Sequence, residues 1–255
     1  MSISEQIKTI KENVPMVHQA GYEMGYSSGH SDGYAQSEDD FWDIVQRSGA
    51  RTSYEQAFAY WDAEYLRPKY KIILQNTRTM NMFGNMSKLK KIEKEFFDFS
   101  QASTSDTAST QGNYTVFRAC VSLQTIEDIG MPAGYYYQTY NYCPELETIE
   151  VIRSNETTMY SSTFDKSPKI KNITIEGVIG QNGFNVSVCK NLTKESIISI
   201  VSALSTTASG KSITFSKTAI NNAFEINVDD ETTYPIGSEY HTLRHSKDNW
   251  TFNYS

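Results

Sequence analysis

The sequence predicts an α/β solenoid, a stack of short parallel strands joined by turns and preceded by a helical or coiled-coil segment. An apolar motif recurs in the middle of the chain with a nearly constant period, and an apolar heptad stripe lies near the N-terminus. The net charge of −7 is also unevenly spread. Residues 1–66 hold eleven acidic and four basic residues, whereas the remaining residues hold nineteen of each. We therefore expect two parts with different tasks.

The recurring motif is aromatic-x-x-small-x-x-Leu/Ile-x-x-Ile. Its copies are Phe83, Met86, Leu89 and Ile92; Phe117, Cys120, Leu123 and Ile126; Tyr140, Cys143, Leu146 and Ile149; Phe164, Ser167, Ile170 and Ile173; and the degenerate Val186, Cys189 and Leu192, followed by Glu195 where isoleucine is expected. The third positions are 34, 23, 24 and 22 residues apart, and a Ser/Thr-rich insertion at 101–112 explains the first step. A period in the low twenties is typical of leucine-rich repeats.

Each copy is too small to bury its own apolar side, so neighbouring copies must stack. The Leu-x-x-Ile part is predicted to be a short strand whose apolar side chains point inward. All three cysteines of the chain, Cys120, Cys143 and Cys189, occupy the same motif position. We interpret them as small buried side chains and not as redox or metal-binding groups.

These repeats resemble the BspA-like subclass of leucine-rich repeat proteins over about residues 70–254. The C-x-x-L-x-x-I core and the aromatic residue at the turn carry the resemblance, while the Ile-Pro pair that often follows the strand in that family is missing. BspA-like repeats are common in surface and phage-associated proteins of gut and oral bacteria. The resemblance implies a repeat domain at 70–255 that ends in a C-terminal cap.

The end of the repeats is also predicted. Thr193 is a suitable N-cap for a helix, and the apolar side chains that follow it recur with helical spacing. They are Ile197, Ile200, Val201 and Leu204. A strand is expected at 212–216, a helical piece at 218–224 and a closing strand within 248–255.

Residues 1–36 are predicted to be an oligomerisation segment. A heptad stripe is formed by Ile3, Ile7, Ile10, Val14 and Val17, and a glycine ladder follows at Gly21, Gly25, Gly29 and Gly33. Isoleucine at both heptad positions favours a trimer. The stripe spans only about two heptads, so an amphipathic helix packing on its own chain is the alternative. The glycine ladder is expected to pack against a partner, with a flexible linker as its alternative.

Residues 37–69 are predicted to be a small helical region. Ser37 can cap its first helix, and the acidic residues at 38–40 suit the positive end of that helix. Aromatic and alanine residues within 53–66 suggest a second helix.

Two surfaces are candidate binding sites. In a leucine-rich repeat, the residues on either side of the inward isoleucine face the concave surface. The first row is Lys91, Thr125, Thr148 and Asn172, and the second is Glu93, Glu127, Glu150 and Thr174. These side chains are either solvated or part of a groove for a cationic, sugar or peptide ligand. The second surface is a tyrosine cluster comprising Tyr135, Tyr136 and Tyr137 together with Tyr140 and Tyr142, of which Tyr140 belongs to the motif.

Catalytic, cofactor and metal sites are not predicted. The pair His241 and His245 lacks a third ligand and is expected to lie in a polar loop. The ASGKS segment at 208–212 precedes a strand, which is the reverse of a phosphate-binding loop. No apolar run is long enough to span a membrane, and no secretory signal is expected. The acidic balance argues against nucleic acid as a partner.

The sequence therefore predicts a non-enzymatic, phage tail-associated protein that displays a leucine-rich repeat surface for recognition of a host surface. The expected partners are the chain itself as a homotrimer, other tail proteins, and a glycan or protein of the host surface. The expected location is the virion tail or the bacterial cell surface. The alternative is a bacterial surface adhesin or a protein interaction scaffold that uses the concave face.

Overall fold

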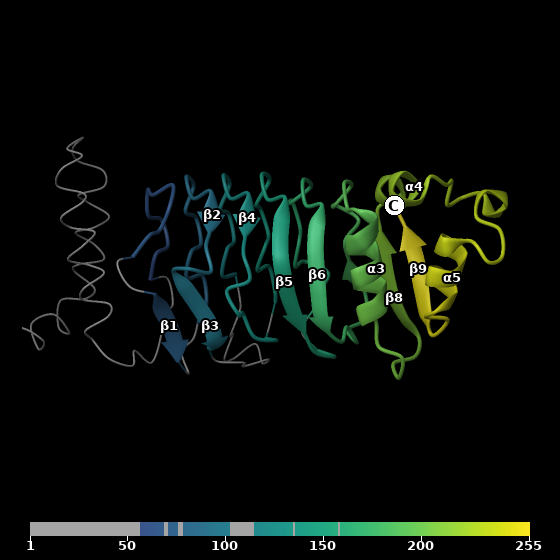
Figure 1. Cartoon of the computed structure of the whole chain (residues 1–255), viewed down its shortest axis with the longest axis horizontal. Coiled ribbons are helices and arrows are strands. Elements are labelled where there is room, and N and C mark those ends of the chain that lie inside the picture. The colour runs from purple at the N-terminus through teal and green to yellow at the C-terminus, as the bar shows by residue number, and fades with distance from the viewer. Residues whose placement is uncertain (1–56, 69–70, 76–78, 103–114, 135, 158) are drawn as a thin grey trace, which may run out of the picture.

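The computed structural model describes residues 57–68, 71–75, 79–102, 115–134, 136–157 and 159–255. They form an elongated molecule in which the elements follow one another along the long axis (Figure 1). The strands of the described residues are short and parallel and lie in three sheets, and the helices lie towards the C-terminal end. The predicted mixture of short parallel strands and helices is therefore confirmed.

The largest sheet joins four motif copies. Its strands, in order, are β2 (Lys91–Ile92), β4 (Thr125–Ile126), β5 (Thr148–Ser154) and β6 (Asn172–Gly177). Ile92 pairs with Ile126, Ile126 with Ile149, and Ile149 with Ile173. The same motif position thus meets its own copy at every step, and these isoleucines are buried as predicted.

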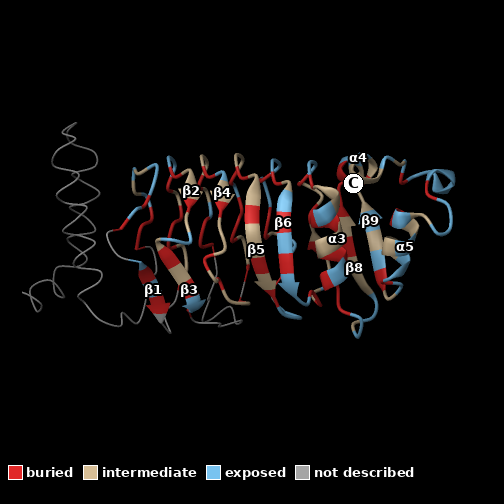
Figure 2. Cartoon of the chain, in the orientation of Figure 1, coloured by how far each residue is buried: buried red, intermediate tan, exposed pale blue. Residues whose placement is uncertain are grey.

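Two smaller parallel sheets flank the large one. In the first, β1 (Ile72–Gln75) pairs with β3 (Phe97–Gln101), a sheet that the motif does not predict. The second contains β7 (Phe184–Asn185), β8 (Lys211–Phe215) and β9 (Trp250–Tyr254). Buried residues recur at each step of the molecule, from β1 to the C-terminal helices (Figure 2).

Aromatic rings at the first motif position form a continuous column through the core. Phe83 stacks on Phe117 with 5.3 Å between ring centroids, Phe117 on Tyr140 at 5.9 Å, and Tyr140 on Phe164 at 5.6 Å. Phe184 continues the column at 6.1 Å from Phe164, so it supplies the ring that the degenerate fifth copy lacks at Val186. We call Phe58, Phe83, Phe117, Tyr140, Phe164 and Phe184 the aromatic column.

The second motif position is buried, and in three copies its side chain donates a hydrogen bond to the aromatic residue of the preceding copy. The Sγ of Cys120 lies 2.9 Å from the carbonyl oxygen of Phe83, and the Sγ of Cys143 lies 3.0 Å from that of Phe117. Ser167 donates in the same way to the carbonyl of Tyr140 at 2.6 Å. In these three copies the position holds a small side chain that can donate, as both Cys and Ser can do. In the other two copies Met86 has no donor, and the Sγ of Cys189 lies 3.9 Å from the carbonyl oxygen of Ser167.

Five of the six rings of the column are followed two residues later by a residue in the left-handed conformation. The φ values lie between 60° and 68° for these residues, which are Tyr60, Asn85, Ala119, Tyr142 and Lys166. The N–H of Tyr142 donates to the carbonyl of Asp165 at 2.8 Å, and equivalent bonds begin at the N–H groups of the three preceding members. We call these five residues the turn row.

Residues 57–68 belong to the same stack and are not helical, in contrast to the second helix predicted there. They form turns, and Tyr65 pairs with Lys91 in an isolated parallel bridge. Phe58 stacks on Phe83 at 5.4 Å, and Leu66 is buried. The aromatic spacing of this segment suits a helix, but Phe58 instead takes the ring position of one more turn. The predicted segment 1–36 and residues 37–56 lie outside the described residues.

The C-terminal elements agree with the prediction. Helix α3 (Lys194–Ala203) is capped by Thr193, whose side chain accepts from the N–H of Ser196, and it buries Ile197, Ile200 and Val201. Strand β8, helix α4 (Lys217–Phe224) and strand β9 fall at the expected places. A short 3-10 helix η1 (Glu231–Thr233) and helix α5 (Glu239–His245) complete this part.

Helix α3 covers the edge of the four-stranded sheet. The hydroxyls of Ser196 and Ser199 accept hydrogen bonds from the N–H groups of Ile173 and Ile175 at 2.9 and 2.8 Å. Ser196 also donates to the carbonyl of Lys171. Because β6 is an edge strand, these bonds satisfy backbone groups that another chain could otherwise pair with.

Replacing Gly177 by alanine tests the close contact between β5 and β6. Gly177 has φ +98°, and a Cβ atom there would lie 2.1 Å from the carbonyl oxygen of Ser154. We expect Gly177→Ala to lower the free energy of unfolding by about 3 kcal/mol in urea denaturation. Gly210→Ala is the control, since Gly210 has φ +64° but no atom within 4 Å of such a Cβ, and it should cost only about 1 kcal/mol. Equal losses would contradict the contact.

Substitutions of Ser167 test the hydrogen bond at the second motif position. Ser167 donates to the carbonyl of Tyr140 and accepts from the N–H of Cys143 at 3.0 Å. We expect Ser167→Ala to cost about 2 kcal/mol, because both backbone groups lose a partner in the core. Ser167→Cys introduces the residue that three other copies carry and should cost less than half as much. If the two variants were equally stable, size alone would explain the choice of residue.

Candidate functional site

The structure places the first predicted row on the face of the four-stranded sheet. Lys91, Thr125, Thr148 and Asn172 lie opposite one another in the parallel register. Asn172 donates from Nδ2 to the Oγ1 of Thr148 at 3.1 Å. We call these four residues the strand row, and the structure thus brings its members together as the repeat predicts.

The predicted row of glutamates is engaged in contacts within the chain. Glu127 accepts from the N–H of Lys94 at 3.0 Å, and Glu150 accepts from the N–H of Asp128 at 3.0 Å. Each carboxylate therefore binds a backbone group of the preceding repeat. The Nζ of Lys91 lies 2.6 Å from Glu127, and this bond is the main reason why the pKa of the Glu127 carboxyl lies below its usual range.

The remaining members of that row are also accounted for. The Nε of Arg67 lies 3.2 Å from Glu93. Thr174 is exposed on β6. Because three carboxylates of the row bind backbone groups or cations, the row is not a bare acidic groove. A cationic ligand would have to displace these contacts, so the structure favours a ligand that is not strongly charged.

A charged network that the motif did not reveal crosses the sheet beyond these rows. Arg153 binds the carboxylate of Asp128 through two bonds of 2.7 and 2.9 Å and lies 3.1 Å from Glu176. The Arg153 guanidinium is the largest reason why the pKa of Asp128 lies below its usual range. The signal in the sequence was present but weak, because the three residues lie at different distances after their isoleucines.

Ion pairs also link neighbouring repeats on either side of the third motif position. Lys88 pairs with Asp62 and Lys90 with Glu64, both at 2.7 Å. Farther along the chain, the same positions are held by the pairs Lys169 with Glu145 and Lys171 with Glu147. Opposite charges at equal positions of adjacent repeats would have predicted them. They are exposed, so each contributes little to stability.

The predicted tyrosine cluster is divided by the structure. Tyr136 is fully buried beside Tyr140, and its hydroxyl donates to the carbonyl of Pro132 at 3.1 Å, so it cannot meet a ligand as predicted. Tyr137 is half-buried with its ring 6.4 Å from that of Tyr160. Tyr142 is 47% exposed. Tyr135, like the heptad and glycine positions of residues 1–36, lies outside the described residues.

The cysteines are buried as free thiols. Burial raises the pKa of Cys143 and Cys189 to about 12 and that of Cys120 well above its usual value. They are therefore protonated at neutral pH and are poor nucleophiles and metal ligands. Among the described residues, no group of three or more His, Cys, Asp or Glu side chains is arranged to hold a metal ion.

The two histidines lie on helix α5 and not in a loop, so that prediction was wrong. Ser238 caps the helix and accepts from the N–H of His241, a start signal that the prediction overlooked. The rings of His241 and His245 are 4.3 Å apart, and the Nδ1 of His245 lies 3.0 Å from Asp248. In the ASGKS segment, Gly210 lies between α3 and β8 with φ +64°, and Lys211 and Ser212 already belong to strand β8.

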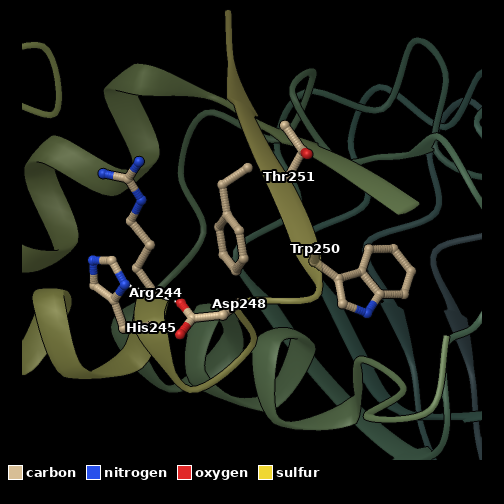
Figure 3. A pocket seen from close by; sticks show the side chains of 6 residues that line it. Arg244, His245, Asp248, Trp250 and Thr251 are labelled. Carbon is tan, nitrogen blue, oxygen red and sulfur yellow. Dashed lines mark hydrogen bonds and ion pairs between the residues drawn. The ribbon is translucent and has the colours of Figure 1, made fainter. Parts of the chain in front are cut away.

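A hollow of about 260 Å³ lies between α5 and β9 (Figure 3). It is lined by Arg244, His245, Asp248, Trp250, Thr251 and Phe252. Its charged groups have partners, because His245 meets Asp248 and Arg244 donates to the hydroxyl of Tyr234 at 3.3 Å. The hollow contains none of the predicted binding residues.

No helix among the described residues is long and apolar enough to cross a membrane. Comparisons with known proteins add no relative: no protein-family model, no curated protein and no solved structure matches the chain. The resemblance to BspA-like repeats thus depends on the motif quoted above, and function must be argued from the residues themselves.

The pair of Asp128 and Arg153 predicts a pH dependence of stability. The folded pKa of Asp128 lies below the unperturbed value of about 3.9, so the carboxylate contributes stability above that pH and the contribution is lost as pH falls through the lower folded value. We expect Arg153→Met to lower the urea midpoint at neutral pH and to reduce its fall below about pH 4. Lys190→Met, which removes an exposed cation, is the control. An unchanged acid profile in Arg153→Met would contradict this assignment.

Proposed function

We propose that the described residues form a leucine-rich repeat solenoid of the BspA-like kind and that the protein binds a host surface as part of a phage tail. The observation that supports the solenoid is the stacking of equal positions: the isoleucines pair in register, the rings stack, and the small residue bonds to the preceding copy. Such a stack offers an extended surface made of residues that are free to vary.

We place binding, not catalysis, at the centre of this function. The cysteines donate to backbone carbonyls, two of the glutamates accept from backbone N–H groups, and the His245 imidazole meets Asp248. The groups that most often carry chemistry are thus used to hold the structure. What varies from repeat to repeat is the outward surface, which is where a binding protein carries its specificity.

The assembly that fits this function is a homotrimer held by residues 1–36. The heptad of isoleucines favours three chains, and the glycine ladder permits close approach of helices. Three solenoids presented together would bind a repetitive surface more tightly than one, because the second and third contacts are made at high effective concentration. Other tail proteins would hold the N-terminal part, and the repeats would face the host.

Light scattering of the full chain tests the assembly. We expect three times the mass of one chain for the wild type and the mass of a single chain for the double substitution Ile7→Asp and Ile10→Asp, because a charge at these positions cannot be buried between helices. Lys8→Asp, at a position off the apolar stripe, is the matched control and should remain a trimer. A monomeric wild type would remove the trimer from the proposal.

Binding to cells tests the function itself. Fluorescently labelled full chain is applied to a panel of gut and oral bacteria. We expect the wild type to bind a subset of strains and the monomeric double variant to bind the same strains at least about tenfold more weakly, because avidity is lost. If the wild type binds no strain, or if the monomer binds equally well, recognition by a displayed trimer is wrong.

A further inference from the structure

In the turn row, the backbone conformation is the same in every member, whereas the side chain differs between members. Each of its members has a left-handed backbone, and the N–H groups of four of them donate to the next turn at 2.8 to 3.0 Å. The row runs along the stack with one residue per repeat, so adjacent members are separated by about one strand spacing, or about 4.8 Å.

Tyrosine is an unexpected residue at two of these positions. Among residues other than glycine, asparagine tolerates the left-handed region best, whereas a bulky side chain is strained there. Asn85 shows that the turn accepts asparagine, and Ala119 shows that no ring is required. Tyr60 and Tyr142 therefore carry a conformational cost that the fold does not demand. Such strain is concentrated at functional sites.

Both rings are exposed, in contrast to the rings of the aromatic column. Tyr60 is 57% and Tyr142 47% exposed, while the members of the column are at most 1% exposed. These two tyrosines stand three repeats apart in the row, a distance of about 14 Å along the stack. They are thus separate aromatic surfaces on one line and not a continuous apolar patch of the kind that binds another protein.

The surroundings of Tyr142 show how a ligand would lie. The Nζ of Lys166 lies over the ring at 5.2 Å from its centroid, which holds the ring and leaves lysine donors beside it. The neighbour on the other side in the row is Ala119, whose methyl group is too small to cover a ring. Arg118 and Asp165, exposed on the two adjoining turns, add a donor and an acceptor of opposite charge.

We propose that the turn row is a carbohydrate-binding site in which the face of a sugar ring stacks on Tyr142 and the saccharide extends along the stack towards Tyr60. A pyranose ring has an apolar C–H face and a polar edge, which match an isolated aromatic ring with charged donors and acceptors around it. The opposite charges of Arg118 and Asp165 balance each other, and the Lys166 ammonium lies over the Tyr142 ring, so a neutral saccharide fits the site. This inference rests on the proposed function, since it names the ligand class of the surface that the solenoid displays.

Two of the test substitutions introduce residues that other repeats already contain at the equivalent position. Tyr142→Asn copies Asn85, and Tyr142→Phe keeps the ring. Tyr65→Thr is the matched control. Like Tyr142, Tyr65 is exposed, at 40%, and has a cation near its ring, with Arg67 4.7 Å from the ring centroid. It lies beside the strand row, however, where the equivalent residues are Thr125 and Thr148. Binding of each full-length protein is measured on an array of bacterial surface polysaccharides and neutral oligosaccharides.

We expect the wild type to bind a set of saccharides, Tyr142→Asn to bind them at least about tenfold more weakly, and Tyr142→Phe and Tyr65→Thr to stay within about threefold of the wild type. The melting temperature of Tyr142→Asn should equal or exceed that of the wild type, because asparagine relieves the left-handed strain. A loss of binding in this variant is then not a loss of folding.

Two results would overturn the inference. The first is a wild type that binds no saccharide on the array, and the second is Tyr142→Asn that binds as the wild type does. Binding to bacterial cells distinguishes these failures from failure of the proposed function. If the wild type still binds cells while Tyr142→Asn binds them unchanged, the protein recognises its host through another surface. If cell binding depends on Tyr65, the strand row is that surface.

Discussion

The contact of each buried position with its own copy in the next repeat is the constraint on which the rest of the structure depends. Parallel strands lie at a fixed spacing of about 4.8 Å, so a side chain at one position meets the same position of its neighbour whatever the length of the loop between them. The rings from Phe83 to Phe164 accept this spacing by stacking nearly parallel, with 3° between Phe83 and Phe117 and 8° between Phe117 and Tyr140, whereas Phe184 at the end of the column is tilted by 59° from Phe164. The same constraint explains why Ser167 can replace cysteine, because both donate to the carbonyl one repeat back. It also explains why the first and second copies can be farther apart in sequence than the others, since Phe83 still stacks on Phe117.

A stack built this way must end, and the C-terminal elements end it through backbone groups. Two serine hydroxyls of helix α3 accept hydrogen bonds from N–H groups of β6. The end of α3 is held in turn by Lys247, whose buried Nζ donates to the carbonyls of Ser202 and Leu204 at 3.1 and 2.5 Å. A cation at the C-terminal end of a helix also meets the negative end of its dipole. Trp250 adds a bond from Nε1 to the carbonyl of Ser205, so β9 is fixed to the residues that follow α3. The described end of the stack is therefore closed by polar contacts as well as by apolar packing.

The sequence predicts residues that recur at the same position of every repeat, but it does not predict contacts that join different positions of two repeats. The period predicted the isoleucines, the leucines and the shared environment of the cysteines, and the capping residue Thr193 predicted the start of α3. The first turn was missed because Phe58 precedes any complete copy of the motif, and its aromatic spacing suits a helix equally well. The pair of β1 and β3 was missed because it lies outside the motif. Contacts between repeats, such as Arg153 with Asp128, need the register of the sheet, which the period gives only for the residues that share a position. Tyr136 was misjudged because its burial comes from packing beside Tyr140 and not from the pattern of its own residues.

The constraint that fixes the inward residues also makes some outward residues informative. In the turn row the backbone geometry is set by hydrogen bonds between turns, so the side chain contributes little to the fold. A residue that suits the backbone there, such as Asn85, needs no further explanation. A residue that suits the backbone poorly, such as Tyr142, is explained either by a function other than folding or by a loss of stability that is small. The strand row differs, because its side chains bond to one another and to neighbouring repeats, as Asn172 does to Thr148 and Lys91 to Glu127. Backbone strain at an exposed side chain is therefore a better guide to a ligand in this protein than the charged rows, whose groups already have partners.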